Sequence, residues 1–179
     1  MKNDIERVLV PQEEIARTVK GLGKRIADEY AGKTPILVSV LKGAFVFMAD
    51  LVREIDIPCT IDFMSVSSYG SGTRTSGEVR IIKDLDTNIE GRHVIIVEDI
   101  LDSGVTLSKL LELLSARHPA SLAVCALFDK PERHIADVKL DFKGLDVPNA
   151  FIVGYGLDYG ELYRNLPDVC VLKPEIYGA

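Results

Sequence analysis

The chain has 179 residues, of which 47% are hydrophobic, so it can bury one substantial core but is short for two independent domains. We therefore expect a single domain over residues 1–179. Its formal net charge is -6, with 21 Lys and Arg against 27 Asp and Glu. This balance argues against a surface built to bind nucleic acid or anionic lipid through long-range attraction.

Neither a membrane protein nor a disulfide framework is indicated. The first residues, MKNDIERVLVPQEE, lack the apolar core of a secretory signal, and the most apolar later segment is interrupted by Lys42. We expect a soluble, cytoplasmic protein with no membrane contact. Cys59, Cys125 and Cys170 lie far apart in apolar surroundings without a CxxC pair, which favours reduced, buried thiols.

The first half of the chain alternates between helix and strand patterns. Apolar residues at helical spacing predict an amphipathic helix from Pro11 to Tyr30. The apolar run 36–41 predicts a buried strand, and the helical pattern 44–55 follows it after a short loop. Residues 60–69 and 78–85 carry the β-branched and aromatic residues of two further strands.

The second half continues the same alternation. Short Val- and Ile-rich runs at 93–97, 121–128, 150–155 and 169–173 predict strands, and 106–118 has a helical pattern. Strands that alternate with helices indicate an α/β fold with a central, mainly parallel sheet flanked by helices.

A polar segment, SYGSGTRTSG, connects the predicted strands 60–69 and 78–85. It is longer than a tight hairpin turn requires and is rich in glycine. By itself this pattern leaves two interpretations open, a surface connection and a lid over a site, and it favours the first.

Three acids follow the strand at 93–97, in the stretch VIIVEDILDSGVTL. In open parallel sheets, ligands bind beyond the carboxyl ends of the strands, and Glu98 and Asp99 are predicted to lie there. Asp102 or Ser103 could simply cap the helix that follows, but capping accounts for only one of these residues. The segment 102–106 also combines a glycine, two hydroxyls and a helix N-terminus, a combination that favours an anion such as phosphate.

The same stretch excludes two common nucleotide motifs. It contains neither GxxxxGK[ST] nor GxGxxG, so it suits one phosphate group and not a triphosphate cradle or a dinucleotide. Glu98 and Asp99 could accept hydrogen bonds from the paired hydroxyls of a ribose. Phosphate and ribose together indicate a sugar phosphate as the ligand.

At this point VIIVEDILDSGVTL resembles the phosphoribosyl-pyrophosphate signature of the type I phosphoribosyltransferases. Further segments, among them LVSVLKGAFVFMADLVREI, DFMSVSSYGSGT, ALFDKPER and FIVGYGLDYGELYRNLPDV, resemble the purine-salvage hypoxanthine-guanine branch, and the resemblance spans nearly the whole chain. It implies the type I phosphoribosyltransferase fold, with a small hood and a flexible lid loop. It also implies Mg²⁺-dependent transfer of the 5-phosphoribosyl group from phosphoribosyl pyrophosphate to hypoxanthine and/or guanine, giving IMP and/or GMP plus pyrophosphate.

The resemblance assigns roles to the residues around the acids. It implies that the loop of Asp102, Ser103, Gly104, Val105 and Thr106 holds the 5′-phosphate. Asp102 would also face the purine N7 as a general base, a role that needs hydrogen-bond reach and a suitable pKa. Glu98 and Asp99 would take the ribose hydroxyls, and whether they also contact Mg²⁺ directly stays open.

Other site residues are implied in later and earlier segments. Leu41, Lys42 and Gly43 match the pyrophosphate loop, in which the Leu-Lys peptide is often cis, and Arg164 matches the pyrophosphate-binding arginine. Asp158 would contact Mg²⁺, so the candidate metal residues are Glu98, Asp99 and Asp158. Lys139 would donate to the exocyclic oxygen of a 6-oxopurine, Phe151 would stack on the base, and Ile152 would offer its backbone. Ser68 and Tyr69 would begin a lid, which reverses the earlier preference for a surface connection.

Two other classes of protein fit part of this pattern, and two positions differ from those of some relatives. A phosphoryl-accepting receiver domain also places acids and a lysine at strand ends, but it leaves DSGVT and LKG unexplained. A regulator that retains the fold and binds the sugar pyrophosphate as a signal is closer, although the acidic net charge weighs against it. Val105 and Leu140 stand where some relatives have Lys and Pro, which leaves the preference among hypoxanthine, guanine and xanthine open. Family members are typically homodimers or homotetramers.

Overall fold

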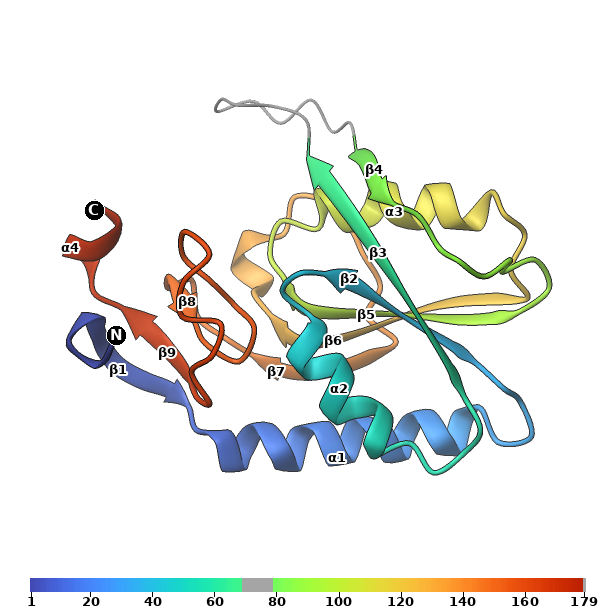
Figure 1. Cartoon of the computed structure of the whole chain (residues 1–179), viewed down its shortest axis with the longest axis horizontal. Helices are drawn as coiled ribbons and strands as arrows, with labels where there is room; N and C mark the ends of the chain where they lie inside the picture. Colours follow the sequence, from blue (N-terminus) through green and yellow to red (C-terminus); the bar gives the residue numbers. More distant parts are fainter. Residues whose placement is uncertain (69–78, 179) are drawn as a thin grey trace.

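The computed structural model describes residues 1–68 and 79–178, which form two sheets and the helices around them (Figure 1). The elements in chain order are η1 (Lys2–Asp4), β1 (Ile5–Val10), α1 (Gln12–Glu29), β2 (Ile36–Leu41), α2 (Phe45–Arg53), β3 (Thr60–Ser68), β4 (Val79–Lys83), β5 (His93–Leu101), α3 (Val105–Ser115), β6 (Ser121–Asp129), η2 (Pro131–Arg133), β7 (Phe142–Asp146), β8 (Ile152–Val153), β9 (Val169–Leu172) and α4 (Pro174–Tyr177).

The larger sheet has six strands in the order β4-β3-β2-β5-β6-β7. All neighbouring pairs are parallel except β3 with β4, which is antiparallel. The predicted α/β fold with a mainly parallel sheet is therefore confirmed. Because β2 lies between β3 and β5, the carboxyl ends of the central strands lie side by side.

Helices cover both faces of this sheet, with α1 and α2 on one face and α3 on the other (Figure 1). Alternate side chains of each strand point to opposite faces, as strand geometry requires. Leu37 and Ile95 belong to the core cluster with α1 and α2, whereas Val38 and Ile96 belong to the cluster with α3. Continuous apolar runs in β2 and β5 follow from burial on both faces.

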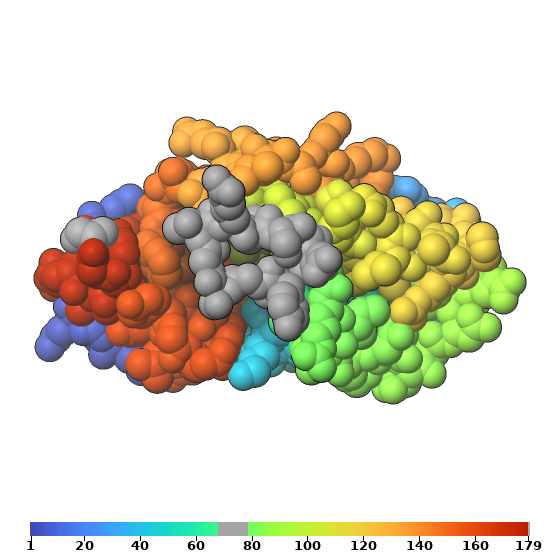
Figure 2. Space-filling view, turned by 90° about the horizontal axis from the view of Figure 1, so that it is seen from above, coloured from blue at the N-terminus to red at the C-terminus, as the bar shows by residue number. Residues whose placement is uncertain are grey.

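A second sheet of three antiparallel strands, in the order β1-β9-β8, lies at one end of the molecule. From above, the small sheet with its blue and red segments lies on one side, and α3 with β4, in yellow and green, lies on the other (Figure 2). The apolar runs 150–155 and 169–173 therefore do not extend the parallel sheet, contrary to the simplest expectation from their alternation with helices. Instead, β9 pairs with β8 on one side and with β1 on the other, a strand that the sequence pattern did not indicate.

The strand before the acids is longer than its apolar run. The predicted strand ends at Val97, whereas β5 continues to Leu101. Glu98 and Asp99 therefore lie within the last residues of the strand and not after its end. Hydrogen bonding to β6 extends through Leu101, which pairs with Asp129. The backbone ladder, and not hydrophobicity, sets the end of this strand.

The helices and the three cysteines bear on the expectations about membranes and thiols. Within the described part of the chain, we find no helix whose length and apolar content would let it span a bilayer. Cys59, Cys125 and Cys170 are free thiols, with Cys125 and Cys170 buried and Cys59 half-buried. Burial raises the pKa of the Cys125 thiol to about 12, which keeps it protonated.

Candidate active site

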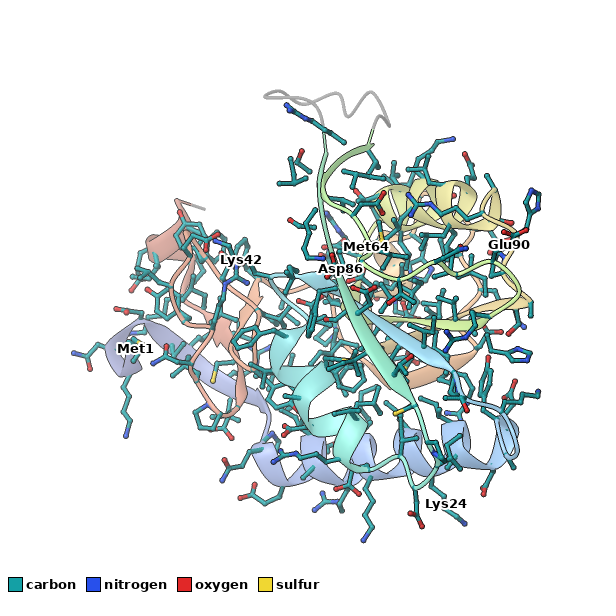
Figure 3. All side chains as sticks on the ribbon, turned by 45° about the vertical axis from the view of Figure 1, so that its right-hand side comes forward. Met1, Lys24, Lys42, Met64, Asp86 and Glu90 are labelled. Atoms are coloured by element: carbon teal, nitrogen blue, oxygen red, sulfur yellow. The ribbon has the colours of Figure 1, made fainter. Side chains whose placement is uncertain are left out.

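The site is assembled from the loops that follow β2, β5 and β6, together with the segment 154–164 that follows β8. The loop after β2 begins with the Leu41–Lys42 peptide, which is cis as the resemblance implied. Lys42 lies between the end of β2 and the small sheet, while Lys24 lies on α1 at the far side of the molecule (Figure 3). The carboxyl edge of the sheet is thus where Lys42 and the acids at the end of β5 lie.

The loop 102–104 turns the chain from β5 into α3. Gly104 is the N-cap of α3 and has a φ of 77°, a left-handed conformation that glycine adopts without steric cost. The carbonyl of Ser103 accepts hydrogen bonds from the N–H groups of Ile135 (2.9 Å) and Ala136 (3.1 Å). The segment 135–136 therefore holds this loop in place, and the N-terminus of α3 lies beside it.

Asp102 does not cap this helix. Its carboxylate instead lies 2.8 Å from Nε of Arg133 and 3.8 Å from Nζ of Lys130. Among the described residues, the Oγ of Ser103 makes one long contact, in which it accepts from the N–H of Val105 at 3.4 Å. The capping alternative is therefore wrong for Asp102, whose carboxylate contacts Arg133 and Lys130 instead.

Glu98 and Asp99 are half-buried at the end of β5, and this environment alters their ionisation. Burial raises the pKa of Asp99 to about 6; the N–H of Ile100 and the guanidinium of Arg164 oppose the shift, and Asp158 adds to it. Burial and the neighbouring Asp99 raise the pKa of Glu98 well above its usual value. Such acids gain from a ligand that brings hydroxyl donors or a cation.

Asp158 and Arg164 lie together with Lys42, although they come from distant parts of the sequence. One Nη of Arg164 lies 2.9 Å from a carboxylate oxygen of Asp158, and the other donates to the carbonyl of Gly156 at 2.7 Å. Glu161 joins this group, since its carboxylate lies 2.7 Å from Nζ of Lys42 and 3.3 Å from Arg164. Sequence reasoning did not single out Glu161.

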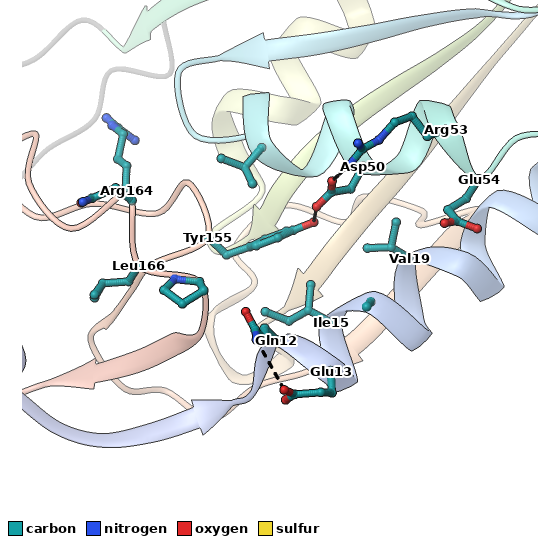
Figure 4. Close-up of a pocket in the computed structure, with 14 residues that line it drawn as sticks. Gln12, Glu13, Ile15, Val19, Asp50, Arg53, Glu54, Tyr155, Arg164 and Leu166 are labelled. Carbon is teal, nitrogen blue, oxygen red and sulfur yellow. Dashed lines mark hydrogen bonds and ion pairs between the residues drawn. The ribbon is translucent and has the colours of Figure 1, made fainter.

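One close backbone approach and one side-chain hydrogen bond hold these segments together. A Cβ at Gly156, whose φ is 99°, would lie 2.2 Å from the carbonyl oxygen of Gly43, so the segment 154–164 packs directly on the loop after β2. Tyr155 also anchors that segment to α2, because its buried hydroxyl donates to Asp50 at 2.5 Å. Figure 4 shows the Tyr155 phenol directed at Asp50, with Arg164 extending away from α1.

A pocket of about 400 Å³ lies beside Asp102, between the end of β6 and the small sheet. It is lined by Ile100, Asp102, Lys130, Arg133, Asn149, Ala150, Phe151, Ile152, Leu157 and Tyr177. Lys130 is 8% exposed, and its ammonium donates to the carbonyl of Ala150 at 2.9 Å. Burial lowers the pKa of this ammonium, and the carboxylate of Asp102 opposes that shift.

Phe151 and Ile152 lie in this pocket, as predicted for residues that contact a planar base. The ring of Phe151 is 38% exposed and stacks on Tyr177 with centroids 4.7 Å apart and an interplanar angle of 19°. Tyr159 contacts the same ring edge-on at 5.4 Å. The neighbouring aromatic rings fix the orientation of Phe151 in the pocket wall.

Lys139 does not lie in this pocket, and its predicted role is corrected. Its side chain is 85% exposed and pairs with Asp141 at 2.5 Å, in a different depression beside α3. The segment from 131 to 141 leaves the sheet edge and returns to start β7, which carries Lys139 away from Asp102. Lys130, the residue directly after β6, reaches the pocket instead.

The predicted lid cannot be compared with the structure. Ser68 is the last residue of β3, while its side chain and Tyr69 lie outside the residues that are described. Their roles stay predictions from the resemblance.

The carboxylates suit Mg²⁺ but do not form a complete metal cage. Among residues 1–68 and 79–178 there is no group of three or more His, Cys, Asp and Glu side chains that could hold a metal by itself. Mg²⁺ is usually held by one or two carboxylates together with substrate phosphates. Asp158 is close enough to Asp99 to raise the pKa of the Asp99 carboxyl, and these two carboxylates fit that pattern.

Gly43 offers a direct test of how tightly this site is packed. A Cβ at this position would lie 1.9 Å from Oδ2 of the half-buried Asp99. We expect Gly43→Ala to lower the free energy of unfolding by about 1–3 kcal/mol and to raise severalfold the KM for phosphoribosyl pyrophosphate, the substrate that the resemblance implies. Urea unfolding and steady-state kinetics measure both effects.

Gly21→Ala is the matched control, because Gly21 lies within α1 and a Cβ there meets nothing within 4 Å. That change should stabilise the protein by about 0.5–1 kcal/mol through helix propensity and leave the KM unchanged. If Gly43→Ala left the KM unchanged and did not destabilise the protein, as expected for Gly21→Ala, the close packing of Asp99 on the loop after β2 would not contribute to substrate binding.

Comparison with known proteins identifies this arrangement. Residues 9–160 match the model of the phosphoribosyl transferase domain family. The chain is 56% identical over 177 residues to the hypoxanthine-guanine phosphoribosyltransferase of Bacillus subtilis (strain 168), an alignment that covers 99% of this chain and 98% of that protein. It is 54% identical over 177 residues to the enzyme of the same name from Streptococcus thermophilus (strain CNRZ 1066), with the same coverage.

A solved structure gives the same answer. A hypoxanthine phosphoribosyltransferase from Staphylococcus aureus superposes with a TM-score of 0.96 at 49% identity, covering 99% of this chain and 96% of that one. The chain therefore belongs to the phosphoribosyltransferase family and, within it, to the hypoxanthine-guanine branch.

Proposed function

We propose that this protein is a purine-salvage enzyme that transfers the 5-phosphoribosyl group from phosphoribosyl pyrophosphate to hypoxanthine and/or guanine. The products are IMP and/or GMP and pyrophosphate. The observation that carries the proposal is the position of Asp102, which lies in the loop before α3 and also lines the pocket of Lys130, Phe151 and Ile152. One residue thus joins an anion-binding helix start to a pocket for a flat, polar ligand.

The sugar phosphate would bind along β5 and the start of α3. The backbone N–H groups of residues 103–106, with the hydroxyls of Ser103 and Thr106, would hold the 5′-phosphate at the positive end of the helix dipole. Glu98 and Asp99 would accept hydrogen bonds from the ribose hydroxyls. Burial raises the pKa of both carboxyls, and such hydroxyl donors would replace the solvation that burial removes.

The base would lie in the pocket beside Asp102. Lys130 would donate to the exocyclic oxygen of a 6-oxopurine, and adenine has an amino donor at that position, which an ammonium cannot accept. Phe151, backed by Tyr177, would stack on the ring, and the backbone of Ile152 would contact the edge of the base. The pocket therefore favours hypoxanthine and guanine over adenine.

Asp102 would act as the general base. As N9 of the purine forms its bond to C1′ of the ribose and the bond from C1′ to the pyrophosphate oxygen breaks, the proton on N7 would pass to the carboxylate of Asp102. Arg133, at 2.8 Å, and Lys130, at 3.8 Å, contact this carboxylate and orient it in the pocket wall.

The leaving pyrophosphate would be held at the other end of the site by Lys42 and Arg164. Arg164 has a buried Nε without a hydrogen-bond partner among the described residues, so it retains a donor for an anionic ligand. Mg²⁺, held by Asp158 and by Asp99 or Glu98, would neutralise charge on the pyrophosphate oxygens. Both cationic side chains would stabilise the charge that develops on the leaving group.

We further propose that residues 1–179 act as one phosphoribosyltransferase domain in a cytoplasmic homodimer or homotetramer. The support is the resemblance to the family, in which such assemblies are typical. No nucleic acid or membrane partner is proposed, in keeping with the net charge of -6.

The test is nucleotide formation by the purified protein with Mg²⁺, phosphoribosyl pyrophosphate and one base at a time. We expect turnover with hypoxanthine, guanine or both, and none with adenine. Comparing the rates with hypoxanthine, guanine and xanthine ranks the preference among these three bases. Binding of phosphoribosyl pyrophosphate without turnover of any base would favour the regulator that retains the fold.

A further inference from the structure

Glu161 occupies an unusual place between the residues proposed to hold pyrophosphate. It lies in a tight turn between Asp158 and Arg164, with a φ of 69°, and its N–H donates to the carboxylate of Asp158 at 2.9 Å. A bridge between Tyr159 and Leu162 closes this turn. The turn directs the Glu161 side chain towards the loop after β2, which starts 119 residues earlier in the chain.

The carboxylate of Glu161 divides its two oxygens between two cations. Oε2 accepts from Nζ of Lys42 at 2.7 Å, and Oε1 lies 3.3 Å from Nη2 of Arg164. A doubly contacted carboxylate between a lysine and an arginine resembles the way oxygens of a diphosphate would bridge the same two groups. The Lys42 ammonium lowers the pKa of the Glu161 carboxyl, so this group is negatively charged at neutral pH.

We infer that Glu161 is an internal competitor for pyrophosphate, whose carboxylate neutralises Lys42 and Arg164 in the free enzyme and is displaced when the diphosphate binds. The inference rests on the proposed function, because that proposal assigns the two cations to pyrophosphate. It adds a residue that weakens binding of the diphosphate, and so sets the affinity for phosphoribosyl pyrophosphate and the ease of pyrophosphate release.

The exposure of these groups makes displacement feasible. The side chains of Lys42 and Glu161 are 67% and 62% exposed, so their ion pair is screened by solvent and contributes little. A displaced Glu161 carboxylate can also be solvated without crossing a buried region. A ligand that carries more charge than a carboxylate, such as Mg²⁺-pyrophosphate, can therefore replace it.

The expected effect follows from the weakness of an exposed pair. Glu161→Gln removes the competing charge and keeps the shape of the side chain, so pyrophosphate should bind roughly twofold to fivefold more tightly. Product inhibition by pyrophosphate should strengthen by the same factor. Glu161→Asp keeps the charge on a shorter side chain, and its affinity should lie between those of the wild type and Glu161→Gln.

The experiment is calorimetric titration of the full-length protein with inorganic pyrophosphate in the presence of Mg²⁺. Glu112→Gln is the matched control, since it removes the same charge and an exposed pair with Lys109 on α3, away from the site. We expect tighter binding by Glu161→Gln and wild-type binding by Glu112→Gln. Equal or weaker binding by Glu161→Gln would overturn the inference, as would an equal gain in both variants.

The outcome is separate from the test of the proposed function. Tighter pyrophosphate binding by Glu161→Gln, in a protein that forms no nucleotide, would support the competitor and contradict the enzyme. Nucleotide formation with unchanged pyrophosphate affinity in Glu161→Gln would do the reverse. Absence of pyrophosphate binding in the wild type and in Glu161→Gln would overturn the inference.

Discussion

Asp102→Asn is expected to lower kcat by about 10²-fold to 10⁴-fold, the usual range for loss of a general base. Asparagine keeps the shape of the side chain but cannot take the N7 proton. The loop 102–106, which we propose holds the 5′-phosphate, is itself held by backbone contacts such as those of the Ser103 carbonyl, so the affinity for phosphoribosyl pyrophosphate should stay within a few-fold of the wild type. Single-turnover kinetics and equilibrium binding of phosphoribosyl pyrophosphate separate the two effects.

Asp146→Asn controls for the charge change in that experiment. Asp146 ends β7 and pairs with Lys143 at 2.8 Å, an exposed contact that resembles the pairing of Asp102 with Arg133. It should leave turnover unchanged. Near-normal turnover in Asp102→Asn would mean that Asp102 only contacts the ligand, and the base would have to be sought elsewhere.

Lys130→Met is the second change with a large expected effect. A hydrogen bond from a charged donor is worth about 1.5–3 kcal/mol, so kcat/KM for hypoxanthine should fall about tenfold to 150-fold. The KM for phosphoribosyl pyrophosphate should change little, because the pocket of Lys130 does not include Lys42 or Arg164. Steady-state kinetics with hypoxanthine and guanine measure the loss.

Lys139→Met is the matched control, because it makes the same chemical change at the position the sequence first indicated. Lys139 pairs with Asp141 on the exposed side of the molecule, so kcat/KM should stay within about twofold of the wild type, as is usual for surface substitutions. A loss in Lys139→Met with normal kinetics in Lys130→Met would restore the original assignment.

Much of the fold could be predicted because its signals are local. The apolar run of β2 was assigned to its actual bounds, Ile36–Leu41, and α1 to within a residue at each end. These elements are long or uniformly buried, so their periodicity is clear in the sequence alone. The β1-β9-β8 sheet was not predicted as a unit, since it joins the two ends of the chain and its register depends on contacts far apart in sequence.

In the candidate site, too, residues that are consecutive in the chain could be predicted from the sequence, whereas a residue brought in by the fold could not. Residues 98–106 were predicted as a group because they are consecutive at the end of a strand and the start of a helix, where the motif itself defines the geometry. Lys42, Asp158 and Arg164 were matched by resemblance, and the structure places them together. Glu161 carried no signal of its own, since a single exposed glutamate in a turn is common in any sequence.

By itself, then, the sequence determined the class of fold and the position of the loop 102–106 with the acids beside it, because each depends on residues close together in the chain. Only the tertiary structure decided which lysine faces the pocket and which carboxylate lies between Lys42 and Arg164. Lys130 and Lys139 are only nine positions apart, but β6 ends at the pocket while the chain turns away before Lys139. The direction of a side chain depends on where the sheet edge ends and how the next segment packs, and these are set by long-range contacts.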